Sequence, residues 1–249
     1  MMVDLIKLDT EKNNQQTIDI DAVSTEEILR KINNEDKTVA LIVEESIGDI
    51  SILVDQIVDR MKVGGRLFYI GAGTSGRLGV LDAAECPPTY GVDKGLVVGI
   101  MAGGDNAMFT AQEGAEDSLE LAAKDLAAYN LCEKDSVIGL AASGRTPYVL
   151  GGLRYARQVG ALTGSISCVK NAEISEAADY PIEAVTGAEA IMGSTRMKAG
   201  TAQKLILNMV STSVMIKLGK VYRNYMVDVK PTNKKLVVRS KNMIRTLTG

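Results

Sequence analysis

A short apolar run at residues 67–69 passes directly into a loop, residues 70–77, that is rich in glycine and hydroxyl side chains. This order is typical of a buried strand that ends in a loop and opens a helix, where backbone N–H groups favour an anion. Gly71, Gly73 and Gly76 have the spacing of a dinucleotide loop, but no acidic residue ends a second strand about 20 residues later, as ribose binding requires. The loop therefore indicates an α/β fold with an anion site and gives little support for a nucleotide.

A second apolar run, residues 137–142, is followed by the same tripeptide, Ser-Gly-Arg, at residues 143–145. Pro147 suits the first turn of a helix, where its missing N–H is no loss. Two such loops on one sheet indicate a polar, phosphate-bearing ligand held from two sides, although two ordinary strand-to-helix turns could have the same composition. The residues that we expect to bind substrate and phosphate here are Gly73, Thr74, Ser75, Gly76, Arg77, Ser143, Gly144, Arg145 and Thr146.

Short apolar strands alternate with helices through the rest of the chain, which predicts a parallel sheet covered on both faces. Ligands of such sheets bind beyond the carboxyl ends of the strands, where both Ser-Gly-Arg loops lie. The expected strands are residues 66–70, 96–102, 136–142, 163–169 and 181–185. The expected helices are residues 75–84, 106–128, 147–159, 172–178, 197–218 and a basic amphipathic one at 234–247.

Two helices are expected before the first strand. The segment Ser24-Thr25-Glu26-Glu27 is a capping box, which predicts a helix that runs to about Asn33. Apolar residues recur with helical spacing from Lys37 to Met61, and Gly64-Gly65 ends that pattern. These helices are expected to pack on the sheet or on a partner subunit.

The sequence contains no histidine, which removes the commonest general acid–base and most catalytic zinc sites. Any proton transfer then depends on Glu, Asp, Lys, Tyr or Cys. Three cysteines without paired spacing, Cys86, Cys132 and Cys168, predict reduced thiols in a cytosol. A net charge of −3 argues against nucleic-acid binding, and no apolar run approaches the roughly 18–20 residues of a membrane span.

Two carboxylates are candidates for that proton transfer. Glu85 precedes Pro87 and Pro88, so we expect it at a helix end, where a negative charge is disfavoured and the pKa of the carboxyl is raised. Glu116 is expected on the helix after the second strand, and the like charges of its neighbours, Glu113 and Asp117, also raise a pKa. Solvated surface glutamates are the alternative for each.

A third segment, residues 187–204, is a polar loop that runs into a helix of small and apolar residues, which indicates a buried helix. Ser194 and Thr195 are expected to cap that helix, and Arg196 and Lys198 could face an anion. A capped core helix with solvated basic residues is the alternative. The expected ligand contacts in this segment are Glu189, Ser194, Arg196 and Lys198.

From about Asp19 to its end, the chain resembles the N-acetylmuramic acid 6-phosphate etherases of the sugar-isomerase (SIS) domain superfamily. Several long motifs carry the resemblance in the right order, at residues 71–79, 85–89, 113–117, 142–148, 194–204 and 226–229. It implies a three-layer α-β-α SIS domain at residues 19–249, with a flavodoxin-like sheet of five parallel strands and additional N-terminal helices. Residues 1–18 are expected to form a flexible arm.

The resemblance also implies an activity. The family cleaves a cytoplasmic sugar phosphate recovered from peptidoglycan to N-acetylglucosamine 6-phosphate and D-lactate, in a homodimer whose site lies near the interface and needs no metal or other cofactor. Glu85 matches the family's proton donor, and Glu116 matches its second catalytic carboxylate. The loops at 71–77 and 143–147 would hold the phosphate.

The chain departs from the family pattern at Asn13 and Gln15, beside the arm's Asn14, and it lacks a helical region that the family carries beyond position 249. Two other functions stay open. A regulatory relative, the glucokinase regulatory protein, binds sugar phosphates without turnover, and an aldose–ketose isomerase would use the same C2 proton. The pair of carboxylates favours an enzyme over a regulatory binder. Release of D-lactate would distinguish an etherase from both the binder and the isomerase.

Overall fold

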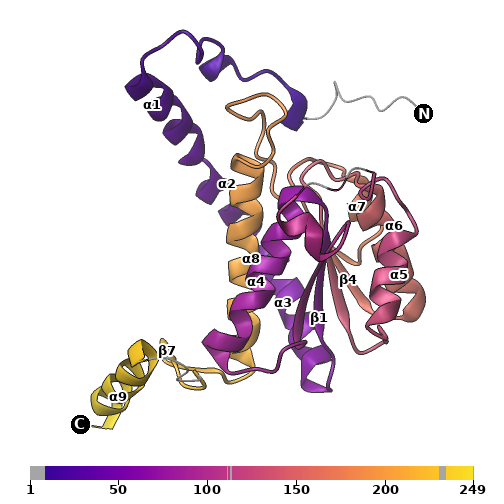
Figure 1. Ribbon diagram of the computed structural model, residues 1–249, viewed down its shortest axis with the longest axis vertical. Coiled ribbons are helices and arrows are strands. Elements are labelled where there is room, and N and C mark those ends of the chain that lie inside the picture. The colour runs from indigo at the N-terminus through magenta and orange to yellow at the C-terminus, as the bar shows by residue number, and fades with distance from the viewer. Residues whose placement is uncertain (1–8, 111, 113, 230–233, 249) are drawn as a thin grey trace.

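The computed structural model describes residues 9–110, 112, 114–229 and 234–248. Its centre is a sheet of five parallel strands in the order β2-β1-β3-β4-β5 (Figure 1). This flavodoxin-like order confirms the predicted α/β class. The strands are β1 Leu67–Gly71, β2 Val97–Met101, β3 Ser136–Leu140, β4 Leu162–Ser167 and β5 Tyr180–Glu183.

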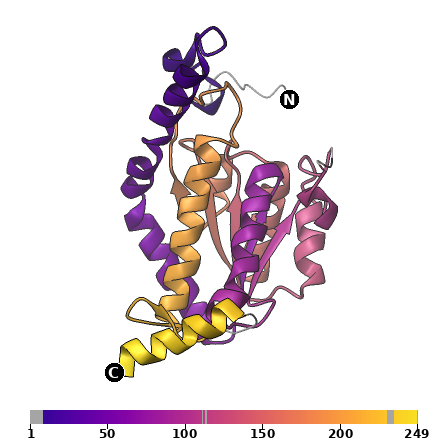
Figure 2. The same cartoon turned by 60° about the vertical axis from the view of Figure 1, so that its left-hand side comes forward.

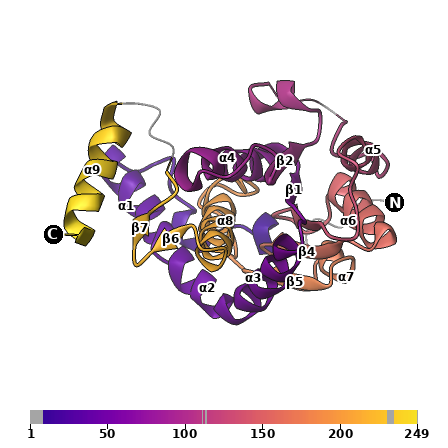
Figure 3. The ribbon, with the colours of Figure 1, turned by 90° about the horizontal axis from the view of Figure 1, so that it is seen from below.

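Side chains of β1 alternate between the two faces of the sheet and supply a core on each. Leu67 and Tyr69 belong to the core under α3, α4 and α8, whereas Phe68 and Ile70 belong to the core under α5, α6 and α7. Figure 3 shows these two groups of helices on opposite sides of the sheet. Their bounds are α3 Ile47–Lys62, α4 Gly73–Tyr90, α5 Leu121–Ala128, α6 Pro147–Val159, α7 Glu173–Glu176 and α8 Lys198–Lys217.

The register of the strands brings the predicted loops together at one edge of the sheet. Gly71, the last residue of β1, is paired with Met101 of β2 and with Leu140 of β3. Gly76 lets α4 start close against this edge, because a Cβ there would lie 2.7 Å from both the Gly71 carbonyl oxygen and the Met101 side chain. The loops after β1, β2 and β3 are therefore neighbours.

The helix α4 is longer than predicted. It was expected to end near residue 84, before the prolines, but it contains Pro87 and Pro88 and runs to Tyr90. It ends at Gly91, whose φ of 67° only glycine adopts readily and whose N–H donates to the Pro87 carbonyl. The expectation that Glu85 ends a helix is therefore wrong.

The helix expected at residues 106–128 is also wrong. A short 3₁₀ helix, η4 Asp105–Met108, is followed by turns, and only Leu121–Ala128 forms the helix α5. Gly114 has a φ of 75°, which is incompatible with a right-handed helix. Glu116 consequently lies in a turn and not on a helix.

Two further differences lie outside the sheet. The segment 37–61 forms two helices that meet at the buried Ser46, and a small antiparallel hairpin of β6 and β7 around Arg223, with a φ of 55°, was not predicted. The remaining elements are η2 Asp9–Glu11, η3 Gln15–Thr17, α1 Thr25–Asp36, α2 Val39–Glu45, β6 Val221–Tyr222, β7 Tyr225–Met226 and α9 Lys234–Thr248. Figure 2 shows α1 and α9 at opposite ends of the molecule.

Within the described residues, no helix combines the length and the apolarity that crossing a bilayer requires.

Candidate active site

A pocket of about 180 Å³, here called the loop pocket, lies beyond the carboxyl ends of β1 and β2. Glu116 reaches it from its turn and meets the predicted anion loop there. Gly73 exposes its backbone to the pocket, since its φ is 53° and open space lies where a Cβ would be. The lining residues are Ala72, Gly73, Arg77, Met101, Ala102, Ala107, Gln112, Gly114 and Glu116.

Two side chains of the first loop are occupied by contacts within the protein. The buried Ser75 hydroxyl donates to Oε1 of Gln203 on α8 at 2.8 Å. The Arg77 guanidinium donates to the carbonyls of Ala107 and Met108 at 2.7 and 2.9 Å. Arg77 thereby fixes η4 to α4 at the wall of the loop pocket. Thr74 is half-buried, and Gly76 is buried at the helix start.

The second loop is connected to Glu116 through the backbone. The Tyr148 N–H, in the first turn of α6, donates to the Glu116 carbonyl at 3.0 Å. Ser143 and Thr146 are half-buried in the same loop, and Nε of the half-buried Arg145 lies 3.8 Å from the Glu173 carboxylate. Gly144 is buried with a φ of 69°, and a Cβ there would collide with Ala172 at 2.4 Å. The structure thus brings Glu116 close to both predicted phosphate loops.

Glu85 lies in a different place. It follows Gly73 by 12 residues along α4, which is about 18 Å at the helical rise of about 1.5 Å per residue. It is exposed and lines a second pocket, here called the helix pocket, between α4 and α8. The residues of this pocket are Leu78, Leu81, Asp82, Glu85, Lys204, Leu207 and Asn208. One chain therefore does not bring the two predicted catalytic carboxylates together.

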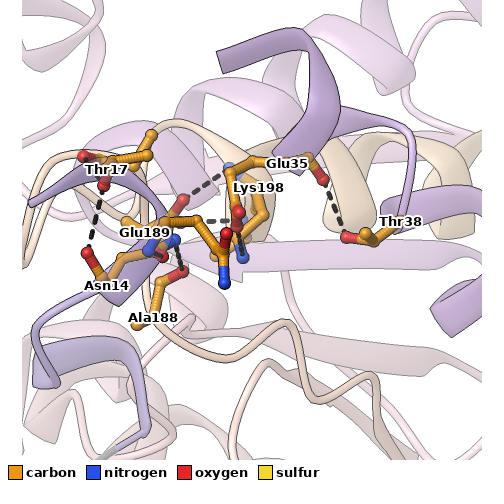
Figure 4. A network of polar contacts seen from close by, with 10 residues as sticks. Asn14, Thr17, Glu35, Thr38, Ala188, Glu189 and Lys198 are labelled. Carbon is orange, nitrogen blue, oxygen red and sulfur yellow. Dashed lines mark hydrogen bonds and ion pairs between the residues drawn. The ribbon is translucent and has the colours of Figure 1, made fainter. Parts of the chain in front are cut away.

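Glu189 caps the buried helix α8 (Figure 4). Its carboxylate accepts the N–H groups of Lys198 and Ala199 at 2.8 and 2.9 Å. Burial raises the pKa of this carboxyl, although the two N–H donors act in the opposite direction. The prediction that Ser194 and Thr195 cap the helix is wrong, because the N-cap is Met197 and a distant carboxylate supplies the acceptors.

The N-terminal segment is bound to the same region. Nζ of Lys198 pairs with the Glu35 carboxylate of α1 at 2.6 Å (Figure 4), and the Lys198 side chain is buried whereas that of Glu35 is 14% exposed. Asn14 donates its amide to the Ala188 carbonyl at 3.3 Å, and Thr17 donates its hydroxyl to the Ala190 carbonyl at 2.8 Å. Of the other two predicted ligand contacts in this segment, Ser194 is half-buried and Arg196 is exposed.

The ion pair of Lys198 and Glu35 gives a prediction on stability. Lys198→Met is expected to lower the free energy of unfolding by about 3 kcal/mol, because it leaves the largely covered Glu35 charge without its partner. Lys217→Met on the same helix is the control, since it breaks the half-exposed pair with Asp55 and should cost about 1 kcal/mol or less. Urea unfolding measures both, and equal losses would contradict the prediction.

Comparison with known proteins identifies the family. The model of the glucokinase regulatory protein N-terminal SIS domain matches residues 49–157. An N-acetylmuramic acid 6-phosphate etherase of Clostridium botulinum is 64% identical over 242 residues, which are 97% of this chain and 80% of the relative. One of Caldanaerobacter subterraneus is 59% identical over 98% of this chain and 80% of its own length. The chain belongs to the N-acetylmuramic acid 6-phosphate etherase family.

Solved structures share the fold of this etherase-family chain at low sequence identity. A phosphoheptose isomerase from Francisella tularensis has a TM-score of 0.62 at 15% identity, and the match covers 78% of this chain and all of that one. A phosphoheptose isomerase from Neisseria gonorrhoeae has a TM-score of 0.57 at 14% identity over 77% of this chain and 98% of its own. Both bear out the predicted SIS-type fold.

Sequence reasoning missed three polar residues of the etherase-family chain. Gln203 holds Ser75 from α8, and Asp82 and Lys204 line the helix pocket with Glu85. Helical spacing contained a signal for Asp82, which lies one turn before Glu85 and so shares its face.

Glu113, predicted to raise the pKa of Glu116, lies outside the described residues. Within those residues, no group of three or more His, Cys, Asp or Glu side chains could hold a metal ion.

Proposed function

We propose that the chain breaks the ether bond of N-acetylmuramic acid 6-phosphate by elimination across C2 and C3 of the sugar. The chain is a carbon–oxygen lyase of amino-sugar recycling, and its relatives are named for this etherase activity. An ether hydrolyses slowly, whereas the C2 hydrogen of the open-chain aldehyde is acidic because it lies beside the carbonyl. Elimination uses that acidity, and the expected products are N-acetylglucosamine 6-phosphate and D-lactate.

The steps need one base and one acid. The base removes the C2 proton, and the electrons of that C–H bond form the C2–C3 double bond as the C3–O bond breaks. The acid gives its proton to the departing oxygen, which leaves as D-lactate. Water then adds at C3 and a proton returns to C2, so that the atoms of one water molecule enter the products. Two carboxyl groups in opposite protonation states can carry out all of this.

Glu116 is the proposed base, and its position in the loop pocket is the observation that carries the proposal. The pocket combines this carboxylate with the exposed backbone of Gly73 at the start of α4. Helix starts favour phosphate, since their first N–H groups have no partner within the helix. A 6-phosphate bound there anchors the sugar and so holds the C2 hydrogen in a fixed orientation relative to the base.

The second loop is the proposed partner of that phosphate. The Ser75 hydroxyl already donates a hydrogen bond to Gln203. The hydroxyls of Ser143 and Thr146 are therefore the better hydrogen-bond donors to the phosphate. Arg145 adds positive charge to this loop. Its ion pair with Glu173 is long, at 3.8 Å, and partly exposed, so it neutralises that charge only weakly. Ser194 and Arg196 complete the proposed ligand contacts from the loop before α8, which Glu189 and Lys198 hold in place.

Ser143→Ala is expected to weaken binding of N-acetylglucosamine 6-phosphate by roughly 1–3 kcal/mol, because a charged acceptor loses its donor. Titration calorimetry measures the change. Ser51→Ala, on the exposed face of α3, is the matched control and should bind as the unchanged chain does. Equal affinities of the two variants would remove Ser143 from the site.

Glu85 is the proposed acid, supplied by a second copy of the chain. Its distance from the loop pocket of its own chain excludes direct action there, whereas a symmetric dimer can bring the Glu85 of one copy over the loop pocket of the other. Exposed apolar side chains on the surrounding helices support such an interface, namely Leu81 of α4, Met209 and Ile216 of α8, and Ile47 and Ile52 of α3.

We propose the cytoplasm as the compartment, in keeping with the three free cysteines.

The test of the activity is incubation of the chain with N-acetylmuramic acid 6-phosphate and an assay for D-lactate. Elimination releases one D-lactate for each N-acetylglucosamine 6-phosphate formed. A ketose phosphate without lactate would indicate an isomerase instead. Tight binding without any product would indicate a sugar-phosphate sensor.

A further inference from the structure

Phe109 is the most exposed large apolar side chain of the described residues, with 92% of its surface open to solvent. It ends η4, and Ala107 of the same short helix lines the loop pocket, so the ring stands at the rim of that pocket. The Arg77 guanidinium holds the carbonyls of Ala107 and Met108, which fixes the backbone that carries the ring. An aromatic ring held in solvent in this way is typical of an anchor at a protein interface, where aromatic residues are enriched.

The helix pocket has the size and the apolar wall that such a ring requires. Its volume is about 160 Å³, and Leu78, Leu81 and Leu207 supply the wall. A cavity of about 150 Å³ lined by side chains of this kind holds a benzene ring. Leu81 is 48% exposed, so the pocket opens to solvent. One chain thus carries both an exposed ring and an open pocket of matching size.

The charges beside the ring and inside the pocket include a complementary pair. Asp105 lies on η4 with the ring and is exposed. Lys204 is exposed at the helix pocket, and among the described residues that line this pocket it is the only cation. Neither side chain forms an ion pair within the part of the chain that the structure describes. A contact between the ring and the pocket can therefore also pair Asp105 with Lys204, which favours this seating of the ring over others.

We propose that Phe109 of one copy of the chain inserts into the helix pocket of a second copy, and that two-fold symmetry forms this contact twice. A symmetric interface needs both complementary surfaces on the same chain, and this chain has both. The ring stands at the rim of the loop pocket and Glu85 lines the helix pocket, so the contact brings Glu85 of one copy to the loop pocket of the other. The inference therefore rests on the proposed function and names the anchor of the dimer that its shared site requires.

Photo-crosslinking locates the ring directly. In the full chain, p-azidophenylalanine replaces Phe109, because it keeps the ring and reacts under ultraviolet light with the side chains that surround it. Mass spectrometry on a mixture of isotopically light and heavy chains is expected to join residue 109 of one copy to Leu78, Leu81 or Leu207 of the other. The same replacement of Val63, exposed at the end of α3, is the control and should not give this product. A cross-link to another surface, or none between copies, overturns the inference.

Sedimentation measures what the contact contributes to the dimer. Phe109→Ala is expected to raise the dissociation constant of the dimer by about 100-fold, since each dimer loses two buried rings. Leu81→Ser, at the exposed wall of the pocket, should shift it in the same direction, Phe109→Leu should recover part of the loss, and Val63→Ala should change nothing. D-lactate release by the Phe109→Ala chain should rise toward the unchanged rate per chain as its concentration is raised, which a damaged fold would not show.

The outcomes separate this inference from the function on which it rests. Unchanged dissociation constants for Phe109→Ala and Leu81→Ser, with D-lactate release retained, overturn the inference and leave the proposed function standing. A dimer that gives the expected cross-link but releases no D-lactate overturns the proposed function and upholds the contact.

Discussion

Glu116→Gln is expected to abolish the exchange of the C2 hydrogen of N-acetylglucosamine 6-phosphate with solvent deuterium, whereas Glu85→Gln is expected to preserve it. The exchange needs only the base that removes the C2 proton, because no ether bond breaks in this sugar. Glu116 lies in the pocket of the anion loop, and Glu85 lies about three turns along α4 from that loop. Each variant should nevertheless lose about 10²–10⁴ in the rate of lactate release, the usual worth of a positioned acid or base.

Proton NMR in D₂O measures the exchange, and a D-lactate assay measures the full reaction. Asp117→Asn is the matched control, since Asp117 is the next carboxylate of the same exposed turn and is not among the residues that line the loop pocket. It should retain both activities. If Glu85→Gln stops the exchange and Glu116→Gln preserves it, the roles of acid and base are reversed.

The sequence was sufficient to predict the sheet and the edge at which the two Ser-Gly-Arg loops meet. The strands β1, β2 and β3 are short, mostly apolar runs whose type does not depend on distant residues, and the two Ser-Gly-Arg loops follow β1 and β3. In a parallel sheet, the loops after neighbouring strands must meet at one edge. Local pattern and topology therefore agree at residues 71–77 and 143–147, and the structure confirms that edge.

The errors arose where a distant residue or a single backbone angle decides the structure. Pro87 and Pro88 usually end a helix, but they lie in the last turns of α4, and Gly91 ends it instead. Gly114 interrupts a segment whose composition suits a helix. No pattern in residues 194–197 reveals that Glu189 caps α8, because that contact depends on how the preceding loop folds back.

The separation of the two carboxylates could not be predicted from their motifs either. The expected helix at residues 75–84 already places Glu85 far from the first loop, but no sequence pattern shows where the segment that carries Glu116 folds. The loop that carries Glu116 bends back to the start of α4, since the Tyr148 N–H holds its carbonyl and Arg77 holds η4. The proposed site therefore takes Glu116 from one chain and Glu85 from a second.

A mixed dimer of two inactive variants is expected to recover activity. One copy carries Glu85→Gln and the other Glu116→Gln, and each carries a different affinity tag so that two purification steps isolate the mixed dimer. If each site takes Glu116 from one copy and Glu85 from the other, one site of the mixed dimer has both native carboxylates and the other has neither. Its specific activity should be about half that of the unchanged dimer, because one of two symmetric sites is intact.

The two variants as separate homodimers are the controls, and each should keep no more than about 1% of the native rate. Recovery in the mixed dimer cannot come from sites built within one chain, because each such site would lack one carboxylate. Absence of recovery in a stable mixed dimer would return both groups to one chain. Either α4 or the Glu116 turn would then have to move, because Glu85 lies about 18 Å along α4 from Gly73 at about 1.5 Å per residue. Sedimentation supplies the second check, since a chain that stays monomeric at micromolar concentration while it releases D-lactate would exclude a shared site altogether.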